Sequence, residues 1–153
     1  MNGKIAVASD HAGFSVKEEV KKRLAERGYE VQDYGTDSEV SVDYPDYGRK
    51  AVEAVRNGGA ESGVLVCGSG VGMSILANRY PGIRAALAPE PETAEMSRRH
   101  NNANVLVLPG WKMTPEEVKA ILDAWFGASF EQGRHQRRLD KIKQIEKDLA
   151  GGG

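Results

Sequence analysis

The single cysteine of the chain, Cys67, stands between an apolar run and a glycine-rich segment, in the sequence VLVCGSGVGMS. A thiolate serves as a base or a nucleophile, and its reference pKa of about 8.5 falls beside a helix N-terminus or a cation. Glycines at 68, 70 and 72 let the backbone approach a ligand and turn N–H groups toward it. The segment therefore predicts an oxyanion cradle beside a reactive thiol, with an inert core cysteine as the ordinary alternative.

The glycine spacing does not match the common nucleotide-binding loops. Met73 stands where G-x-G-x-x-G requires its third glycine, and the lysine of a P-loop is absent. About twenty residues further on, at Ala88 and Pro89, there is no acidic residue to bind a ribose. A small oxyanion is therefore expected, not a nucleotide.

Other side chains suited to the same chemistry occur near the ends of predicted strands and on the predicted last helix. They are Asp10, His11, Tyr44, His100, Asn101, Arg134 and Arg138. The two arginines are four residues apart, so they share one face of a helix and suit a phosphate. Taken singly, each residue has an ordinary explanation, such as a helix cap for Asp10 or a solvated basic face for the arginine pair. Their convergence on one site is stronger evidence than any one of them.

Alternating strand and helix patterns must position these residues. Apolar, β-branched runs predict strands at 4–9, 30–34, 63–67, 83–88 and 104–109, and helical patterns lie at 14–27, 45–57, 71–78, 91–100 and 114–126. Such apolar strands joined by helices predict a single α/β domain over 1–153, with a doubly wound, five-stranded parallel sheet covered on both faces. Ligands bind beyond the carboxyl ends of such strands, where Cys67 ends the third strand.

A final helix is predicted in the segment that follows Gly127. Leu139, Ile142, Ile145 and Leu149 fall on one face of it. This apolar face needs a partner, which is either its own domain or a second subunit.

Composition limits the classes of protein. With 40% hydrophobic and 28% charged residues and a net charge of −1, the chain is an ordinary globular one without the basic balance typical of nucleic-acid binding. One cysteine excludes an internal disulfide and a multi-thiolate zinc site. No apolar run approaches the roughly 18 residues of a membrane span, and the N-terminus lacks a signal-peptide pattern, so a cytoplasmic protein without a membrane partner is expected.

The ordered motifs SDHAGF, DYPDYG, CGSGVGMSILAN, GIRAAL, SRRHNNANVL, DAWF and FEQGRHQRR resemble the ribose-5-phosphate isomerase B family, which also contains galactose- and allose-phosphate isomerases. The resemblance extends from Lys4 to about Ile145. It implies a Rossmann-like α/β/α sandwich that works without a metal or other cofactor. It also implies a homodimer or homotetramer with the active site at the subunit interface, where the last helix is expected to lie.

The resemblance also assigns roles. Cys67 would be the base that moves a proton between C2 and C1 of ribose 5-phosphate to give ribulose 5-phosphate. His100 would open the sugar ring with help from Asp10, and Ser69, where many relatives have threonine, would pass a proton between the two oxygens. Phosphate would bind to His11, Arg134 and Arg138. The full set of expected substrate-binding residues is His11, Tyr44, Gly68, Gly70, Val71, Gly72, Asn101, Arg134 and Arg138.

Two departures from the family pattern leave the substrate open. Trp111, with Lys112 beside it, stands where the family usually has a phosphate-binding arginine, and the segment APEPE at 88–92 differs from the usual one. Isomerisation of a tetrulose, allose or galactose phosphate is therefore an alternative. A non-catalytic sugar-phosphate sensor is a second, and a thiol redox protein ranks last because no resolving cysteine is present.

Overall fold

A computed structural model describes residues 3–152 of the chain. Its five strands form one all-parallel sheet in the order β2-β1-β3-β5-β4. The strands are β1 (Lys4–Ser9), β2 (Glu30–Asp33), β3 (Ser62–Cys67), β4 (Ala85–Leu87) and β5 (Val105–Pro109). The helices are α1 (Phe14–Glu26), α2 (Tyr44–Arg56), α3 (Val71–Ala77), α4 (Pro91–Asn101), α5 (Pro115–Phe126) and α6 (Arg134–Gly152).

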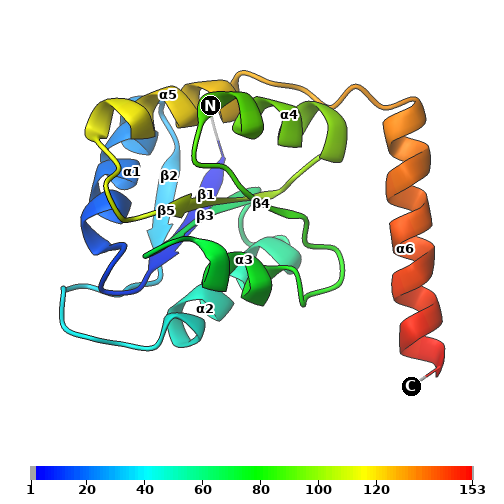
Figure 1. The fold of residues 1–153 in the computed structure, drawn as a ribbon, viewed down its shortest axis with the longest axis horizontal. Coiled ribbons are helices and arrows are strands. Elements are labelled where there is room, and N and C mark those ends of the chain that lie inside the picture. Colours follow the sequence, from blue (N-terminus) through cyan, green and yellow to red (C-terminus); the bar gives the residue numbers. More distant parts are fainter. Residues whose placement is uncertain (1–2, 153) are drawn as a thin grey trace.

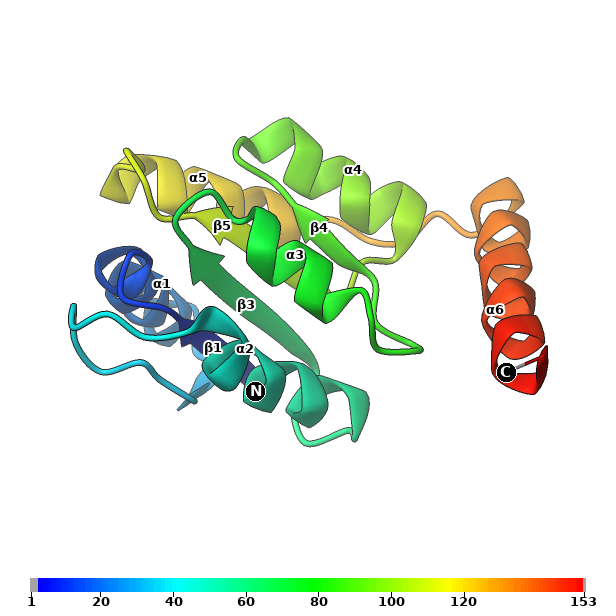
Figure 2. The same ribbon diagram turned by 60° about the horizontal axis from the view of Figure 1, so that its bottom comes forward.

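Helices cover both faces of the sheet, as Figure 2 shows. Helices α1, α4 and α5 pack on one face, where Val64 and Val66 of β3 point, and α2 and α3 pack on the other with Leu65 and Cys67. The central strands are buried on both faces, which explains their continuous apolar runs. This arrangement confirms the predicted doubly wound, Rossmann-like sandwich.

The predicted element boundaries agree closely with the structure. The largest difference is β4, which pairs only over Ala85–Leu87 and not over the whole apolar run at 83–88. Helix α5 begins as its sequence predicts, because the Thr114 hydroxyl accepts a hydrogen bond from the Glu117 N–H at 3.2 Å. Gly127 follows the end of that helix with φ −84, outside the left-handed region.

Helix α6 stands away from the rest of the molecule (Figure 1). Its apolar side chains Ile142, Ile145 and Leu149 are exposed, at 53%, 55% and 73%. The apolar face of α6 is therefore not packed against its own domain. Within residues 3–152, no helix combines the length and apolarity needed to cross a membrane.

Candidate functional site

The thiol lies where three strands end side by side. Cys67, the last residue of β3, pairs in register with Pro109 at the end of β5, and Val66 pairs with Ser9 at the end of β1. Two hydrogen bonds join the loop after β5 to the loop after β3. The Gly110 N–H donates to the Cys67 carbonyl at 2.8 Å, and the Trp111 N–H donates to the Gly68 carbonyl at 3.1 Å. The sheet therefore fixes the loops that follow β1, β3 and β5 against one another.

Residues 67–73 form what we call the cradle. Gly70 has φ +82, and a Cβ there would lie 2.5 Å from Leu87 and 3.4 Å from the backbone of Leu108, so this turn requires glycine. The backbone N–H groups of Gly70, Gly72 and Met73 face the Cys67 sulfur. The cradle thus presents backbone donors to an anion, as the glycine spacing predicts.

Burial nevertheless dominates the acidity of the thiol. Cys67 is 5% exposed, and this burial raises its pKa above the ordinary 9.0. The three backbone N–H groups lower the pKa, but by less, and the nearby charge of Asp10 raises it further. In this chain burial therefore outweighs the backbone donors, whereas the sequence suggests that the start of a helix lowers the pKa of the thiol.

Two predicted residues follow β1 and hold loops in place. Asp10 is 8% exposed, and its Oδ1 accepts a hydrogen bond from the Gly13 N–H at 3.0 Å. Gly13 itself is the N-cap of α1, so Asp10 closes the turn before the helix and is not the helix cap that its ordinary explanation supposes. His11 Nδ1 accepts from the Val42 N–H at 3.1 Å. A neutral His11 therefore carries its proton on Nε2, which remains a donor for a ligand.

Ser69 lies on the exposed side of the cradle. Its hydroxyl oxygen accepts from the Val71 N–H at 3.2 Å, which orients the side chain and leaves its O–H proton to be donated.

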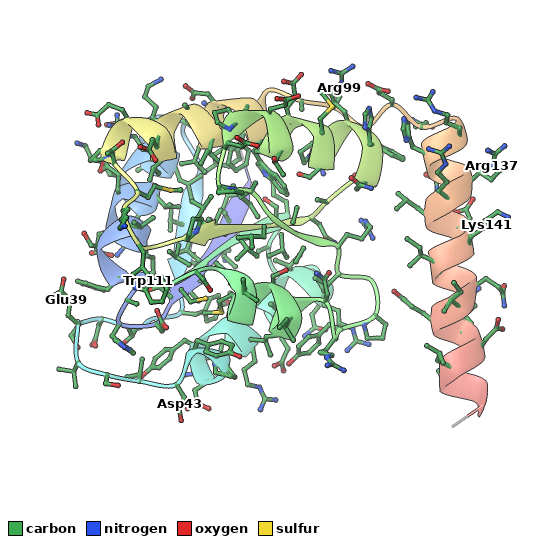
Figure 3. The ribbon with its side chains drawn as sticks, in the orientation of Figure 1. Glu39, Asp43, Arg99, Trp111, Arg137 and Lys141 are labelled. Atoms are coloured by element: carbon green, nitrogen blue, oxygen red, sulfur yellow. The ribbon has the colours of Figure 1, made fainter. Side chains whose placement is uncertain are left out.

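Two aromatic rings lie against the cradle. A Cβ on Gly72 would be 2.6 Å from the Tyr44 ring, and one on Gly68 would be 2.5 Å from the Trp111 indole. Trp111 is 64% exposed and lies beyond the carboxyl end of β5 (Figure 3). The indole thus lies beside the thiol loop and is available to a ligand.

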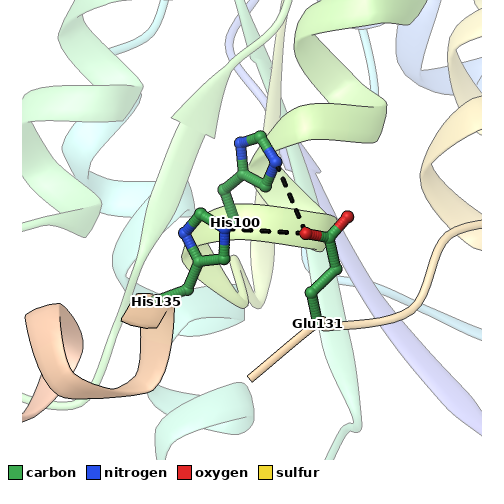
Figure 4. A group of neighbouring side chains, drawn as sticks. All are labelled: His100, Glu131 and His135. Atoms are coloured by element: carbon green, nitrogen blue, oxygen red, sulfur yellow. Dashed lines mark ion pairs between the residues drawn. The ribbon is translucent and has the colours of Figure 1, made fainter. Parts of the chain in front are cut away.

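A second group, which we call the histidine cluster, comprises His100, Glu131 and His135 (Figure 4). The two imidazole rings stack with centroids 4.3 Å apart and planes 11° from parallel. Glu131 Oε1 lies 3.8 Å from His100 Nε2 and 3.6 Å from His135 Nε2. Arg99 binds the other oxygen of Glu131 at 2.7 Å, and this bond lowers the pKa of the Glu131 carboxyl.

His135 is a residue that the sequence analysis does not single out. It is 6% exposed, and in the described part of the chain its Nε2 has no hydrogen-bond partner. Burial lowers its pKa, and the charges of Arg134, His100 and Arg138 lower it further. Its position within the motif FEQGRHQRR, between the two predicted phosphate-binding arginines, is the sequence signal that marks it.

The cradle lies at the carboxyl end of the sheet's strands, whereas the histidine cluster lies at their amino end. Cys67 ends a strand, whereas His100 and Asn101 end α4, which runs back toward the amino end of β5. Arg134 and Arg138 lie on α6 beyond the cluster, both exposed. The predicted site residues therefore form two separate groups within one chain and do not converge, because a helix between two parallel strands must run antiparallel to them.

Comparison with known proteins covers most of the chain. The sequence model of the Ribose/Galactose Isomerase family matches residues 5–142. Ribose-5-phosphate isomerase B of Escherichia coli strain K12 is 48% identical over 143 residues, which is 94% of this chain and 96% of that protein.

Solved structures agree with the sequence comparison. A ribose 5-phosphate isomerase from Thermotoga maritima has a TM-score of 0.89 at 53% identity and covers 92% of this chain and 97% of its own. Ribose-5-phosphate isomerase B from Mycoplasma genitalium, with bound ribulose-5-phosphate, has a TM-score of 0.90 at 40% identity over 96% of this chain and 98% of its own. These similarities confirm the resemblance found in the sequence motifs, and the chain belongs to the Ribose/Galactose Isomerase family.

Proposed function

We propose that this chain interconverts ribose 5-phosphate and ribulose 5-phosphate, with Cys67 as the base. One observation carries the proposal: a buried thiol at the carboxyl edge of the sheet, faced by backbone N–H groups of Gly70, Gly72 and Met73. The relative from Mycoplasma genitalium, whose structure holds ribulose-5-phosphate, supports this choice of substrate. The conversion belongs to pentose phosphate metabolism, which fits a cytoplasmic enzyme.

The proposed reaction is a proton transfer through an enediolate. The Cys67 thiolate takes the proton from C2 of the open-chain aldose, and the electron pair of that C–H bond moves to form the C1–C2 double bond while O1 becomes an oxyanion. Ser69 passes the hydroxyl proton of O2 to O1, and the thiol returns its own proton to C1. Backbone donors aimed at the developing oxyanion stabilise it without rearrangement at the moment of reaction. No step needs a metal or other cofactor.

We further propose that two copies of the chain complete each site. His100, Asn101, Arg134 and Arg138 lie at the opposite edge from the cradle, so a second copy must bring them to the thiol of the first. In this assembly His100 opens the sugar ring with Asp10. The arginines then bind the phosphate together with the Nε2 proton of His11. Tyr44, Asn101 and the cradle backbone at Gly68 and Val71 complete the proposed substrate contacts.

Two exposed apolar surfaces support a homodimer or a larger homo-oligomer. Val71 and Ile75 on α3 are 49% and 54% exposed, and α6 exposes its own apolar face. A groove runs between α6 and the loop before β4, lined by residues that include Pro81, Arg84, Leu139 and Ile142. Apolar surfaces of this kind are typical of subunit interfaces.

A second candidate substrate class follows from Trp111. Its indole lies against Gly68, where a planar ring narrows the cradle but cannot make the bidentate phosphate contact of an arginine. A narrower cradle would suit a tetrulose phosphate, whereas an indole that stacks on a sugar face would suit an allose or galactose phosphate.

The test is aldose–ketose interconversion of four-, five- and six-carbon sugar phosphates in the presence of a metal chelator. We expect turnover of ribose 5-phosphate that survives chelation and falls at least about a hundredfold in Cys67→Ala. Cys67→Ser is the matched control, since its hydroxyl fills the same space but is a much weaker base, and it should be equally impaired. Activity of either variant equal to wild type would remove Cys67 as the base. Turnover of another sugar phosphate alone would keep the chemistry and change the substrate.

A further inference from the structure

We propose that the histidine cluster binds a divalent transition-metal ion of the zinc type, and that this ion withdraws His100 from catalysis. The site would be inhibitory and separate from the cradle of the same chain. Imidazole and carboxylate ligands suit zinc, nickel and copper, and three protein ligands with one water are a common set for zinc.

The distances in the cluster are close to those of a bound ion. One ligand atom from each of His100, Glu131 and His135 lies within 4.8 Å of the other two. A tetrahedral ion with bonds of about 2.0–2.1 Å holds its ligands roughly 3.3 Å apart. The two measured nitrogen-to-carboxylate distances, 3.6 and 3.8 Å, exceed that separation by only a few tenths of an ångström.

The buried nitrogen of His135 is the second, independent observation. Its Nε2 lies in a side chain that is 6% exposed, faces Glu131 Oε1 at 3.6 Å, and has no hydrogen-bond partner among the described residues. A buried polar atom without a partner is unfavourable, and a metal bond removes that cost.

The surroundings fix the carboxylate in a ligating position. Arg99 holds Glu131 Oε2, so Oε1 is turned toward both imidazoles (Figure 4). The Glu131 N–H also donates to the Arg99 carbonyl at 3.0 Å, which ties the segment before α6 to α4. Such outer contacts orient metal ligands and strengthen binding.

One side chain must move to complete the site. The imidazole planes are only 11° from parallel, so their lone pairs do not yet converge on one point. Burial holds His135, whereas His100 is about one-third exposed at 35% and can turn about its Cβ–Cγ bond. Ion binding therefore changes the orientation of the ring that the proposed function assigns to opening the sugar.

Binding is tested on the full-length protein with Co²⁺, whose visible absorption reports tetrahedral nitrogen and oxygen ligands, and with Zn²⁺ by calorimetry. We expect His135→Gln and Glu131→Gln each to weaken binding at least about a hundredfold, since loss of an outer contact alone costs up to that amount. Cys67→Ala and His11→Gln are matched controls that remove the only cysteine and the third histidine, and they should bind as wild type does. Glu131 is partly exposed, so its variant keeps the test valid should His135→Gln fail to fold.

The contrary results are equally definite. Absence of binding in wild type, or binding that is lost in Cys67→Ala and kept in His135→Gln, would overturn the site. The effect on turnover rests on the proposed function: Zn²⁺ should inhibit wild type, and a chelator should restore it. Binding without inhibition of an active enzyme would overturn the inhibitory role. Binding by a protein that isomerises no sugar phosphate would keep the metal site and reject the proposed function instead.

Discussion

The cradle and the histidine cluster are built in different ways. The cradle is formed by backbone, at a place where parallel strands end together and glycines allow close approach, as at Gly70. The cluster is formed by side chains that meet only because the segment after α5 crosses to the end of α4. The comparison shows that the sheet alone determines the geometry of the first group, whereas the second depends on how distant segments and, as we propose, subunits come together.

The largest expected effect tests whether the two groups form one site across subunits. Cys67→Ala and His100→Ala should each reduce turnover at least about a hundredfold, because each removes a group that moves a proton. In a mixed dimer, one site carries both substitutions and the other carries neither. Refolding the two inactive variants together should therefore restore about a quarter of wild-type activity, since random pairing gives half mixed dimers.

The control for this experiment is the double variant Cys67→Ala/His100→Ala mixed with the Cys67→Ala variant, in which no intact site can form. Turnover should stay at the level of the single variants. Suppose that native mass spectrometry shows mixed dimers but mixing the two single variants restores no activity. Cys67 and His100 would then belong to one site within a single subunit, or would not share a site at all.

The next prediction compares Gly13, in the loop beside the cradle, with Gly133, which lies near the histidine cluster. Gly13 has φ −98, but a Cβ there would lie 2.6 Å from the Val66 carbonyl oxygen, so Gly13→Ala should lower the free energy of unfolding by about 2 to 3 kcal/mol through overpacking. Gly133, just before α6, has φ +58 with nothing within 4 Å of a Cβ. Gly133→Ala should cost only about 1 kcal/mol, from backbone strain. Urea unfolding measures both losses, and an equal or larger loss for Gly133→Ala would contradict the larger cost expected from overpacking at Gly13.

The cradle side was the more predictable from sequence. The apolar run before Cys67, the glycine spacing after it and the rule that ligands bind beyond strand ends together placed the thiol correctly. The acidity of the thiol was not predictable, because burial and backbone donors oppose each other and burial dominates only through the packing around Cys67. The packing of Trp111 against Gly68 was also hidden, since these residues are far apart in sequence.

Of the histidine cluster, the sequence analysis predicts only His100, whose role comes from the family resemblance. Spacing places His100 at the end of a helix, but nothing local shows that Glu131 and His135 lie beside it. The stacking depends on the path of the chain between α5 and α6, a segment without periodic signal. The apolar face of α6 could be predicted from Ile142 and Ile145, whereas its separation from the domain could not.

The smallest expected effect is on the pH dependence of stability. Cys67 of the cradle should act in the alkaline range, and His135 of the histidine cluster should act in the acid range. Burial raises the pKa of Cys67 above the ordinary 9.0, with Asp10 adding to the shift and the N–H groups of the cradle opposing it. Above pH 9.0 the unfolded chain therefore loses the thiol proton before the folded one does. The folded state then binds more protons, so its stability falls as pH rises beyond that point.

His135 should act in the acid range. Burial and the charges of Arg134, His100 and Arg138 lower its pKa below the ordinary 6.5, while Glu131 opposes the shift. The unfolded chain then binds more protons as pH falls through 6.5, so stability is present above that pH and is lost below it. Thermal unfolding measured from acid to alkaline pH in a chelating buffer should show a shallower alkaline loss in Cys67→Ala and a shallower acid loss in His135→Gln. An alkaline loss unchanged by Cys67→Ala would mean that the thiol already titrates at its ordinary value in the folded protein.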